Sequence, residues 1–389
     1  MNRSTRARAA SARGNEFPPF DLVRLLTTVF SLEGGESFGV FTDLPDPRLV
    51  DGFAYLKLPA LGPQKHAYHT LYRGLLERAA EFGSAGASFY AYKETGGSNL
   101  DLPATVRTPE GERLDLRTAL RRHPIVLYMG GWSATAPLTA LAKEIGFRGA
   151  TMHGTNDIVL ATGLAVDYRQ VSARAERMRV ALTRADAMRL DWSVGGYQVS
   201  LRLDLGGQEA QKSHGLVRAV GDVANLPAGE VYYVPTGGEG FLPRKFEDEA
   251  GTVAIFEVRA RGLTGIYHLV KGERAVAEAQ VALIREDPSA GQLTELGLGT
   301  QSLPWAHTDI QDEKILGTAH VATGRSDHLG GDIDSSSFRN KRNASHNDIL
   351  YTPEKTPEVA LRSVRMRRGG AEVLVLEDYE PAELLRSLL

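Results

Sequence analysis

Histidines and carboxylates set among glycines are concentrated in the second half of the chain, and these residue types could support metal chemistry. Imidazole nitrogens and carboxylate oxygens are ligands for zinc, iron, manganese and cobalt. The chain contains no cysteine, so a metal site here would use only nitrogen and oxygen ligands, as open catalytic sites commonly do. The residues that stand out are Glu230, Glu295, Asp312, Glu313, His320, His346 and Asp348.

Spacing alone supports a shared site for only some of these residues. His346 and Asp348 in "ASHNDILY" are two positions apart, so on a strand they would project from the same face. Glu295 stands in the apolar run "GQLTELGLGTQ", where an ionised carboxylate needs a counter-charge or a metal. Each residue also has a simpler explanation: His320 fits a hydrogen-bonded core or surface histidine, and Glu230 fits a strand-entry carboxylate. Convergence in the folded chain decides between these alternatives.

Further polar residues are candidates for contact with a substrate. His153 and Asp157 in "ATMHGTNDIVLATG" could reach a cleft from the first half of the chain, or this stretch could simply cap the helix that follows it. His307 in "LPWAHTDIQDE" lies in a loop near the expected ligands. The glycine turn in "YMGGWSATAP" matches neither phosphate-binding nor nucleophile motifs, so we interpret it as an ordinary strand-to-helix turn.

The elements that must position these residues change in character near residue 220. In residues 17–220, strand-like and helical runs alternate, which predicts an α/β domain with a parallel sheet. The run "HPIVLYMGG" followed by "SATAPLTALAKEIG" predicts a strand and then a helix, with Ser133 as its N-cap and Gly146 as its stop. We expect a helix over "LYRGLLERAAEFG", a long helix over "DYRQVSARAERMRVALTRADAMRL", and then a hairpin over "WSVGGYQVSLRLDLGG".

Residues 221–389 are predicted to form a smaller, mostly antiparallel α+β domain. The segments "TVAIFEVRARG", "GIYHLVKGERAVAEAQVALI" and "VRMRRGGAEVLVLEDYEP" indicate strands, the last as a hairpin around Gly369 and Gly370. The polar stretch "DIDSSSFRNKRNASHND" is too long for a simple turn, and long loops in compact domains often carry function. A metal-binding domain is therefore expected to follow the α/β domain.

Length, net charge and composition limit the kind of protein that this sequence can be. A length of 389 residues predicts two domains, and a net charge of −3 gives no general attraction to nucleic acid or anionic lipid. The sequence contains no apolar run close to the ~20 residues that cross a bilayer. The lack of cysteine fits a cytoplasmic location. The Arg-rich start, residues 1–16, has no apolar core of a secretory signal, and we expect a disordered leader, with a transit peptide as the alternative.

Four segments in order resemble the C-terminal domain of the aminopeptidase T family of metallopeptidases. They are "NLPAGEVY", "ELGLGT", "DEKILGTAHVATG" and "NASHND", within about residues 221–350, and "RGATMHGTND" extends the resemblance weakly into the first half. The resemblance implies two bridged zinc, cobalt or manganese ions in a cleft, a homodimer, and hydrolysis of a peptide or small-molecule substrate by metal-activated water. The metal ligands it implies are Glu230, Glu295, Glu313, His320, His346 and Asp348.

The sequence departs from the peptidase pattern at three places. Asn343 replaces a serine, and the Asp-Glu pair lies farther from His320 than in the peptidases. The family's tyrosine after the histidine segment is replaced by Asp327 or His328, and we count Asp327 among the candidate substrate contacts. Loss of one oxyanion donor of this kind costs about 2.7–4 kcal/mol in other enzymes.

The same fold is used by 2,5-dihydroxypyridine dioxygenase, which holds one iron(II) with two histidines and a carboxylate. His320, His346 and Asp348 could form such a triad, leaving positions open for oxygen and substrate. A third alternative is a non-catalytic relative that binds a ligand in a biosynthetic pathway. The presence of Glu230 and Glu295, which a lone triad does not need, favours the hydrolase.

Overall fold

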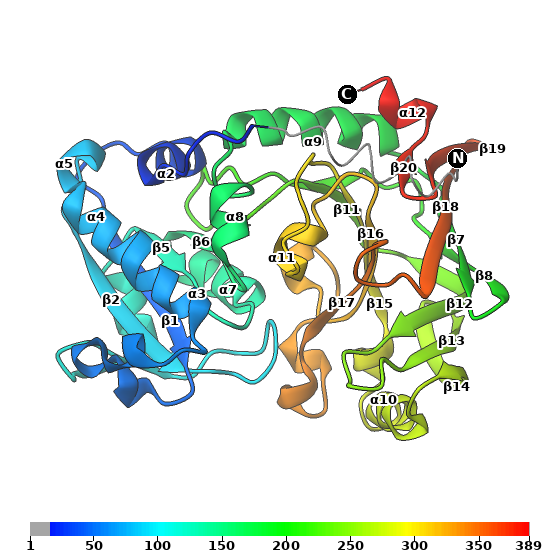
Figure 1. The fold of residues 1–389 in the computed structure, drawn as a ribbon, viewed down its shortest axis with the longest axis horizontal. Helices are drawn as coiled ribbons and strands as arrows, with labels where there is room; N and C mark the ends of the chain where they lie inside the picture. Colours follow the sequence, from blue (N-terminus) through cyan, green and yellow to red (C-terminus); the bar gives the residue numbers. More distant parts are fainter. Residues whose placement is uncertain (1–15, 389) are drawn as a thin grey trace.

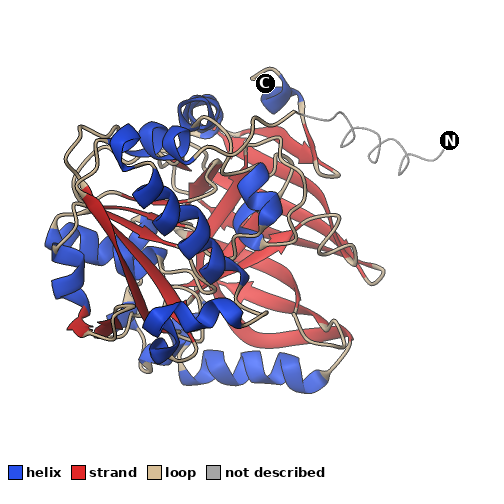
Figure 2. Ribbon diagram, turned by 60° about the vertical axis from the view of Figure 1, so that its left-hand side comes forward, coloured by secondary structure: helices blue, strands red, loops and turns tan. Residues whose placement is uncertain are grey.

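A computed structural model describes residues 16–388, and within this range the strands form three sheets in a mixed α/β arrangement. Figure 1 shows the first part of the chain, in blue and cyan, beside the part that carries most of the later strands. Figure 2 shows that most helices gather around the first part, whereas strands dominate the second. The predicted leader lies outside the described residues except for Glu16.

The first sheet has seven strands in the order β10-β6-β5-β1-β2-β3-β4, and its first five strands run parallel. The last two strands pair antiparallel at one edge. Its strands are β1 (Ser37–Leu44), β2 (Gly86–Lys93), β3 (Thr105–Arg107), β4 (Arg113–Asp115), β5 (Ile125–Tyr128), β6 (Arg148–Thr151) and β10 (Val223–Asn225). This arrangement agrees with the predicted parallel sheet.

Apolar side chains cover both faces of this sheet. Along β5, Ile125 and Leu127 enter one hydrophobic cluster, whereas Val126 and Tyr128 enter another. Continuous apolar runs are typical of parallel strands because helices cover both sides of such a sheet. The helical segments around it are α2 (Leu22–Phe30), η1 (Pro47–Lys57), α3 (Gly62–His66), η2 (Ala67–Tyr72), α4 (Arg73–Glu77), α5 (Ala79–Phe82), α6 (Leu116–Arg121), α7 (Thr135–Ile145), α8 (Asp157–Ala161) and α9 (Tyr168–Leu182).

The other two sheets are built largely from the second half of the chain. The five-stranded sheet, in the order β17-β16-β15-β11-β9, contains β9 (Gln211–Ser213), β11 (Glu230–Tyr233), β15 (Leu293–Gly299), β16 (Ala319–Gly324) and β17 (His346–Tyr351). The eight-stranded sheet, in the order β14-β13-β12-β8-β7-β18-β19-β20, contains β7 (Ala187–Val194), β8 (Tyr197–Asp204), β12 (Gly237–Lys245), β13 (Val253–Arg259), β14 (Gly262–Lys271), β18 (Val359–Arg368), β19 (Ala371–Glu377) and β20 (Glu380–Pro381). Their facing apolar side chains form one shared core.

Further helical segments lie between these strands or, in the case of α12, after the last of them. They are α10 (Arg274–Glu286), η3 (Pro288–Gly291), α11 (Asp309–Asp312), η4 (Asp327–Leu329), η5 (Ser335–Ser337), η6 (Lys341–Asn343) and α12 (Glu383–Arg386). Helix α10 corrects the strand expected over 265–284, because apolar positions spaced three and four residues apart bury Ala277, Val281 and Ile284 against the core. Only the first part of that stretch is the strand β14.

The strands are not divided between the sheets at a single point near residue 220. The hairpin of β7 and β8 precedes that point but pairs within the eight-stranded sheet, and β10 follows that point but pairs with β6 in the seven-stranded sheet. The chain therefore passes from one sheet to another and returns. Division into domains at 220 stays a prediction, whereas the mixed α/β class is present.

Two helices end or begin differently from the sequence expectation. The long helix expected over 167–190 ends at Leu182, because the following residues form β7 and pair with β8 and β18. The N-terminus of α7 is capped by Asn99 from a distant loop, whose Oδ1 accepts a hydrogen bond from the Ala136 N–H at 2.9 Å. Gly146 ends α7 as expected, with a φ of 95° that favours glycine.

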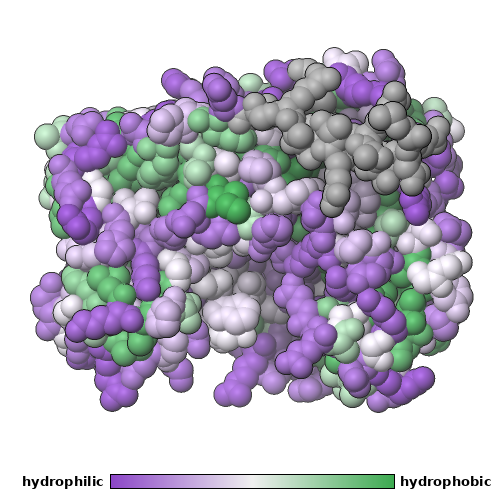
Figure 3. All heavy atoms as spheres, in the orientation of Figure 1, coloured by the Kyte–Doolittle hydropathy of each residue, from purple (hydrophilic) through white to green (hydrophobic). Residues whose placement is uncertain are grey.

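No helix among residues 16–388 is long and apolar enough to cross a membrane. The face drawn in Figure 3 is mostly hydrophilic, with hydrophobic side chains scattered among polar ones. Scattered apolar groups of this kind are ordinary on protein surfaces.

Candidate metal centre

One face of the five-stranded sheet carries Glu230, Glu295, His320, His346 and Asp348, whereas Glu313 stands at the end of α11. Side chains alternate along a strand, so Leu296 and Leu298 of β15 enter the core whereas Glu295 projects to the opposite face. In the register of the sheet, His320 of β16 lies opposite Gly297, and Asp348 of β17 lies opposite Ala322. Glycine and alanine between the ligands leave room for them. Four segments distant in sequence thus bring their polar side chains to one place.

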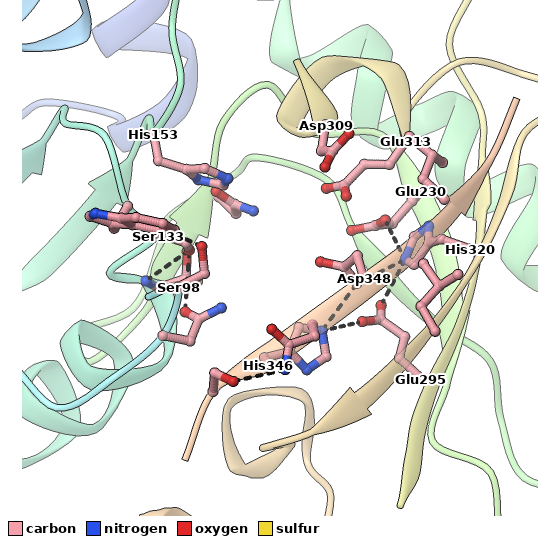
Figure 4. Close-up of a pocket in the computed structure, with 18 of the residues that line it drawn as sticks. Ser98, Ser133, His153, Glu230, Glu295, Asp309, Glu313, His320, His346 and Asp348 are labelled. Atoms are coloured by element: carbon pink, nitrogen blue, oxygen red, sulfur yellow. Dashed lines mark hydrogen bonds and ion pairs between the residues drawn. The ribbon is translucent and has the colours of Figure 1, made fainter. Parts of the chain in front are cut away.

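The ligand atoms lie close together around the two imidazole rings. His346 Nε2 is 3.0 Å from Glu295 Oε2 and 3.3 Å from Asp348 Oδ1. His320 Nε2 faces three carboxylates, at 3.6 Å from Glu295, 3.7 Å from Glu230 and 3.9 Å from Asp348. Figure 4 shows these side chains pointing toward one another from the neighbouring strands.

These atoms form three overlapping sets that could each hold a metal ion. Within each set the ligand atoms lie within 4.8 Å of one another, which suits ligands ~2 Å from a common ion. The sets are Glu230, Glu295 and His320; Glu295, His346 and Asp348; and Glu313, His320 and Asp348. All six predicted ligands therefore occur in them. His320 Nδ1 and Glu230 Oε2 are buried without a hydrogen-bond partner among the described residues, so the pocket contains unsatisfied polar atoms that suit a metal centre.

A backbone contact orients His346 toward the cluster. Its Nδ1–H donates to the carbonyl oxygen of Arg325 at 2.6 Å, which leaves Nε2 facing Glu295 and Asp348. Hydrogen bonds of this kind fix the tautomer and the ring orientation of metal-binding histidines. The Arg325 side chain is itself held by Asp327, at 2.7 Å between Nε and Oδ1, and by Asp101.

Burial and the charges of neighbouring side chains shift the pKa values of the residues in the cluster. Burial lowers the pKa of His320, but Glu295 and the neighbouring carboxylates outweigh burial and raise it to about 10. Burial raises the pKa of Glu295, but the two histidines outweigh burial and lower it to about 2. For Glu313, burial is stronger than the attraction of Lys314 and raises the pKa to about 8. A metal ion would therefore have to displace protons from these histidines when it binds.

The cluster forms the floor of a cleft of about 1090 Å³. The opposite wall comes from the first half of the chain and includes Ser98, Ser133 and His153, as Figure 4 shows. Burial lowers the pKa of His153 to about 4, so this ring is neutral at pH 7. Its buried Nδ1 has no partner among the described residues and is free to contact a substrate.

The other three predicted substrate contacts do not line this cleft. Asp157 is 96% exposed and lies 3.4 Å from His66, at the start of α8, where Asn156 provides the cap. The Asp327 carboxylate binds Arg325 and helps to orient the loop behind His346. His307 stands in the loop before α11 and is not among the residues that line the cleft.

Lys314 and Tyr232 lie beside the predicted ligands and were missed by sequence reasoning. Lys314 is buried and its Nζ lies 2.6 Å from Glu230 and 2.5 Å from Glu313. The sequence pattern that could have indicated Lys314 is "DEKIL", in which a lysine directly follows two acidic residues and precedes two apolar ones. Tyr232 stands two residues after Glu230, so it shares the ligand face. Burial and the nearby Glu295 and Glu230 raise the pKa of Tyr232, which keeps its hydroxyl protonated.

Comparison with known proteins shows a shared fold. The chain matches no protein-family model and no curated protein sequence. It is similar in structure to 2,5-dihydroxypyridine dioxygenase from Pseudomonas putida KT2440, at 14% identity and a TM-score of 0.55, covering 90% of this chain and 92% of that one. It is also similar to wild-type AmpT from Thermus thermophilus, at 13% identity and a TM-score of 0.54, covering 92% and 98%. At this identity, the likeness shows the fold alone.

Proposed function

We propose that the chain is a metal-dependent hydrolase that cleaves an amide or related bond in a peptide or small polar substrate. One observation carries this proposal: five nitrogen and oxygen ligands from one sheet face, and Glu313 from the end of α11, converge at the floor of a large cleft. A divalent ion held there would polarise a substrate carbonyl and lower the pKa of a bound water. The similarity in fold to an aminopeptidase supports this class of chemistry.

The residues of the chain have separate tasks in this proposal. Glu295, His346 and Asp348 hold the ion, with His320 close to Glu295 and Asp348. The Arg325 carbonyl keeps His346 in its orientation. His153, neutral and facing the cleft from the opposite wall, binds the substrate or accepts a proton from it. Tyr232 is the candidate donor to a developing oxyanion, in place of the peptidase tyrosine that this sequence lacks.

Metal content and amide cleavage together test the proposal. We expect the purified protein to bind zinc, cobalt or manganese and to release amino acids from a panel of amino-acid amides and dipeptides, detected by mass spectrometry. His346→Ala should lose both properties. His268→Ala is the matched control, since His268 packs on Tyr197 away from the cleft and should keep both. Metal binding without amide cleavage, but with oxygen consumption, would contradict the hydrolase.

A mononuclear iron(II) oxygenase is the second candidate. One specific observation favours it: Lys314 already pairs with one oxygen of Glu230 and one of Glu313. Asp348 Oδ1 lies 3.3 Å from His346 Nε2 and 3.9 Å from His320 Nε2, so these three side chains can act together without those two carboxylates. The similarity in fold to 2,5-dihydroxypyridine dioxygenase supports this alternative. Oxygen uptake in the presence of iron(II) and a dihydroxylated aromatic ring would support it. Absence of both metal binding and turnover would favour a binding protein.

A further inference from the structure

Lys314 lies inside the ligand cluster rather than at its edge. Its side chain is only 1% exposed, and its Nζ contacts Glu230 Oε1 at 2.6 Å and Glu313 Oε1 at 2.5 Å. The backbone on both sides is fixed, because the Lys314 N–H donates to Gln311 and its carbonyl accepts from Gln301. The ammonium group therefore has a defined position between two of the six predicted ligands.

Glu230 and Glu313 are the carboxylates that a second metal ion would need. One ion can be held by Glu295, His346 and Asp348 without either of them. A second ion would have to use Glu230, Glu313 or both, together with atoms shared with the first. Lys314 already occupies one oxygen of each of these two carboxylates. Two cations a few ångströms apart in a buried site repel each other strongly.

We propose that the Lys314 ammonium takes the place of a second metal ion, so that the centre binds a single divalent ion. This inference rests on the proposed metal centre. Charge supports it, because one divalent ion and one ammonium bring three positive charges to the four carboxylates Glu230, Glu295, Glu313 and Asp348. Two divalent ions beside Lys314 would bring five positive charges and exceed the charge of all four carboxylates. A buried excess of positive charge is costly.

Metal stoichiometry tests this inference without any assay of activity. We expect elemental analysis and calorimetric titration with Mn²⁺ to give one ion per wild-type chain, and electron paramagnetic resonance to show isolated Mn²⁺. Lys314→Met removes the ammonium with little change of side-chain volume, and we expect it to bind two ions whose spins are coupled. Lys355→Met is the matched control, because Lys355 also lines the cleft between two carboxylates, Asp309 and Glu247, and this variant should still bind one ion.

The outcomes separate this inference from the proposed function. Two ions in the wild-type chain, or one ion in both wild type and Lys314→Met, would overturn the role of Lys314 and leave the metal centre intact. No ion in the wild type would overturn the metal centre itself. If Lys314→Met does not fold, the wild-type spectrum at a twofold excess of Mn²⁺ decides: isolated ions support the inference, and a coupled pair contradicts it.

Discussion

A glycine on the neighbouring strand leaves the space that the His320 ring occupies. A Cβ atom at Gly297 would lie 2.1 Å from Cε1 and 2.3 Å from Nε2 of His320, far inside van der Waals contact. His320 therefore occupies space that only glycine leaves free on the neighbouring strand. The conformational freedom of this glycine is unimportant here, because the requirement is one of volume.

Gly297→Ala is expected to displace the His320 ring. Overpacking of this kind costs about 1–3 kcal/mol of unfolding free energy. Metal affinity should fall by about 10- to 100-fold, as it does when the orientation of a ligand is disturbed. Urea unfolding and calorimetric metal titration measure the two effects. Gly62→Ala is the control, because nothing lies within 4 Å of a Cβ there, and it should change neither quantity. An unchanged metal affinity in Gly297→Ala would show that His320 does not bind the ion.

At the scale of single elements, a buried histidine joins three strands of the parallel sheet. His123 precedes β5, and its ring nitrogens contact Ser37 of β1 at 3.2 Å and Tyr90 of β2 at 3.0 Å. The ring also packs on Gly39, where a Cβ would lie 2.7 Å from it. Burial lowers the pKa of His123 to about 4. Burial therefore makes protonation of this ring unfavourable in the folded chain.

This shift predicts a dependence of stability on pH. The unfolded chain takes up a proton at His123 near pH 6.5, whereas the folded chain takes it up only near pH 4. The contribution of His123 to the unfolding free energy is therefore fully present above pH 6.5. It falls as the pH decreases from 6.5 to about 4 and does not change further below pH 4. When the pH is lowered from 7.5 to 5, His123→Gln should lose less unfolding free energy than the wild type. Urea unfolding at the two pH values measures these losses. Equal losses would contradict this assignment.

Helices and strands whose bounds follow from a local sequence pattern were predicted well. Those whose bounds depend on pairing with a distant strand were predicted poorly. The strand at "IVLY" follows from a local apolar run. The end of α7 follows from Gly146, because glycine readily adopts the positive φ found there. The end of α9 and the sheet to which β7 belongs depend on pairing with β18, more than 160 residues later. The predicted ligand residues were chosen through the order of their motifs. The burial of Lys314 depends on how the segment after α11 folds against β11, which sequence spacing does not reveal.

For the molecule as a whole, a metal ion would join segments that are far apart in the chain. Its ligands would come from β15, β16 and β17, each held in the core by apolar neighbours. Metal binding should therefore stabilise the folded chain, by about 2.7 kcal/mol at an ion concentration 100 times the Kd.

Thermal unfolding in the presence of Zn²⁺ or of a chelator measures this stabilisation. The wild-type melting temperature should be higher with the ion than after its removal, because the ion binds the folded chain more tightly than the unfolded one. His346→Ala should unfold at the same temperature in both conditions. A metal-independent melting temperature in the wild type would mean that the ion does not bind this folded site.

The pairing of β7 with β18 also bears on how the protein is made. Strand β7 (Ala187–Val194) leaves the ribosome long before β18 (Val359–Arg368), its neighbour in the finished sheet. At ordinary rates of translation this interval lasts roughly 10–30 seconds. During it, the nascent polypeptide exposes one unpaired edge of β7, which is the kind of edge that recruits other chains or chaperones.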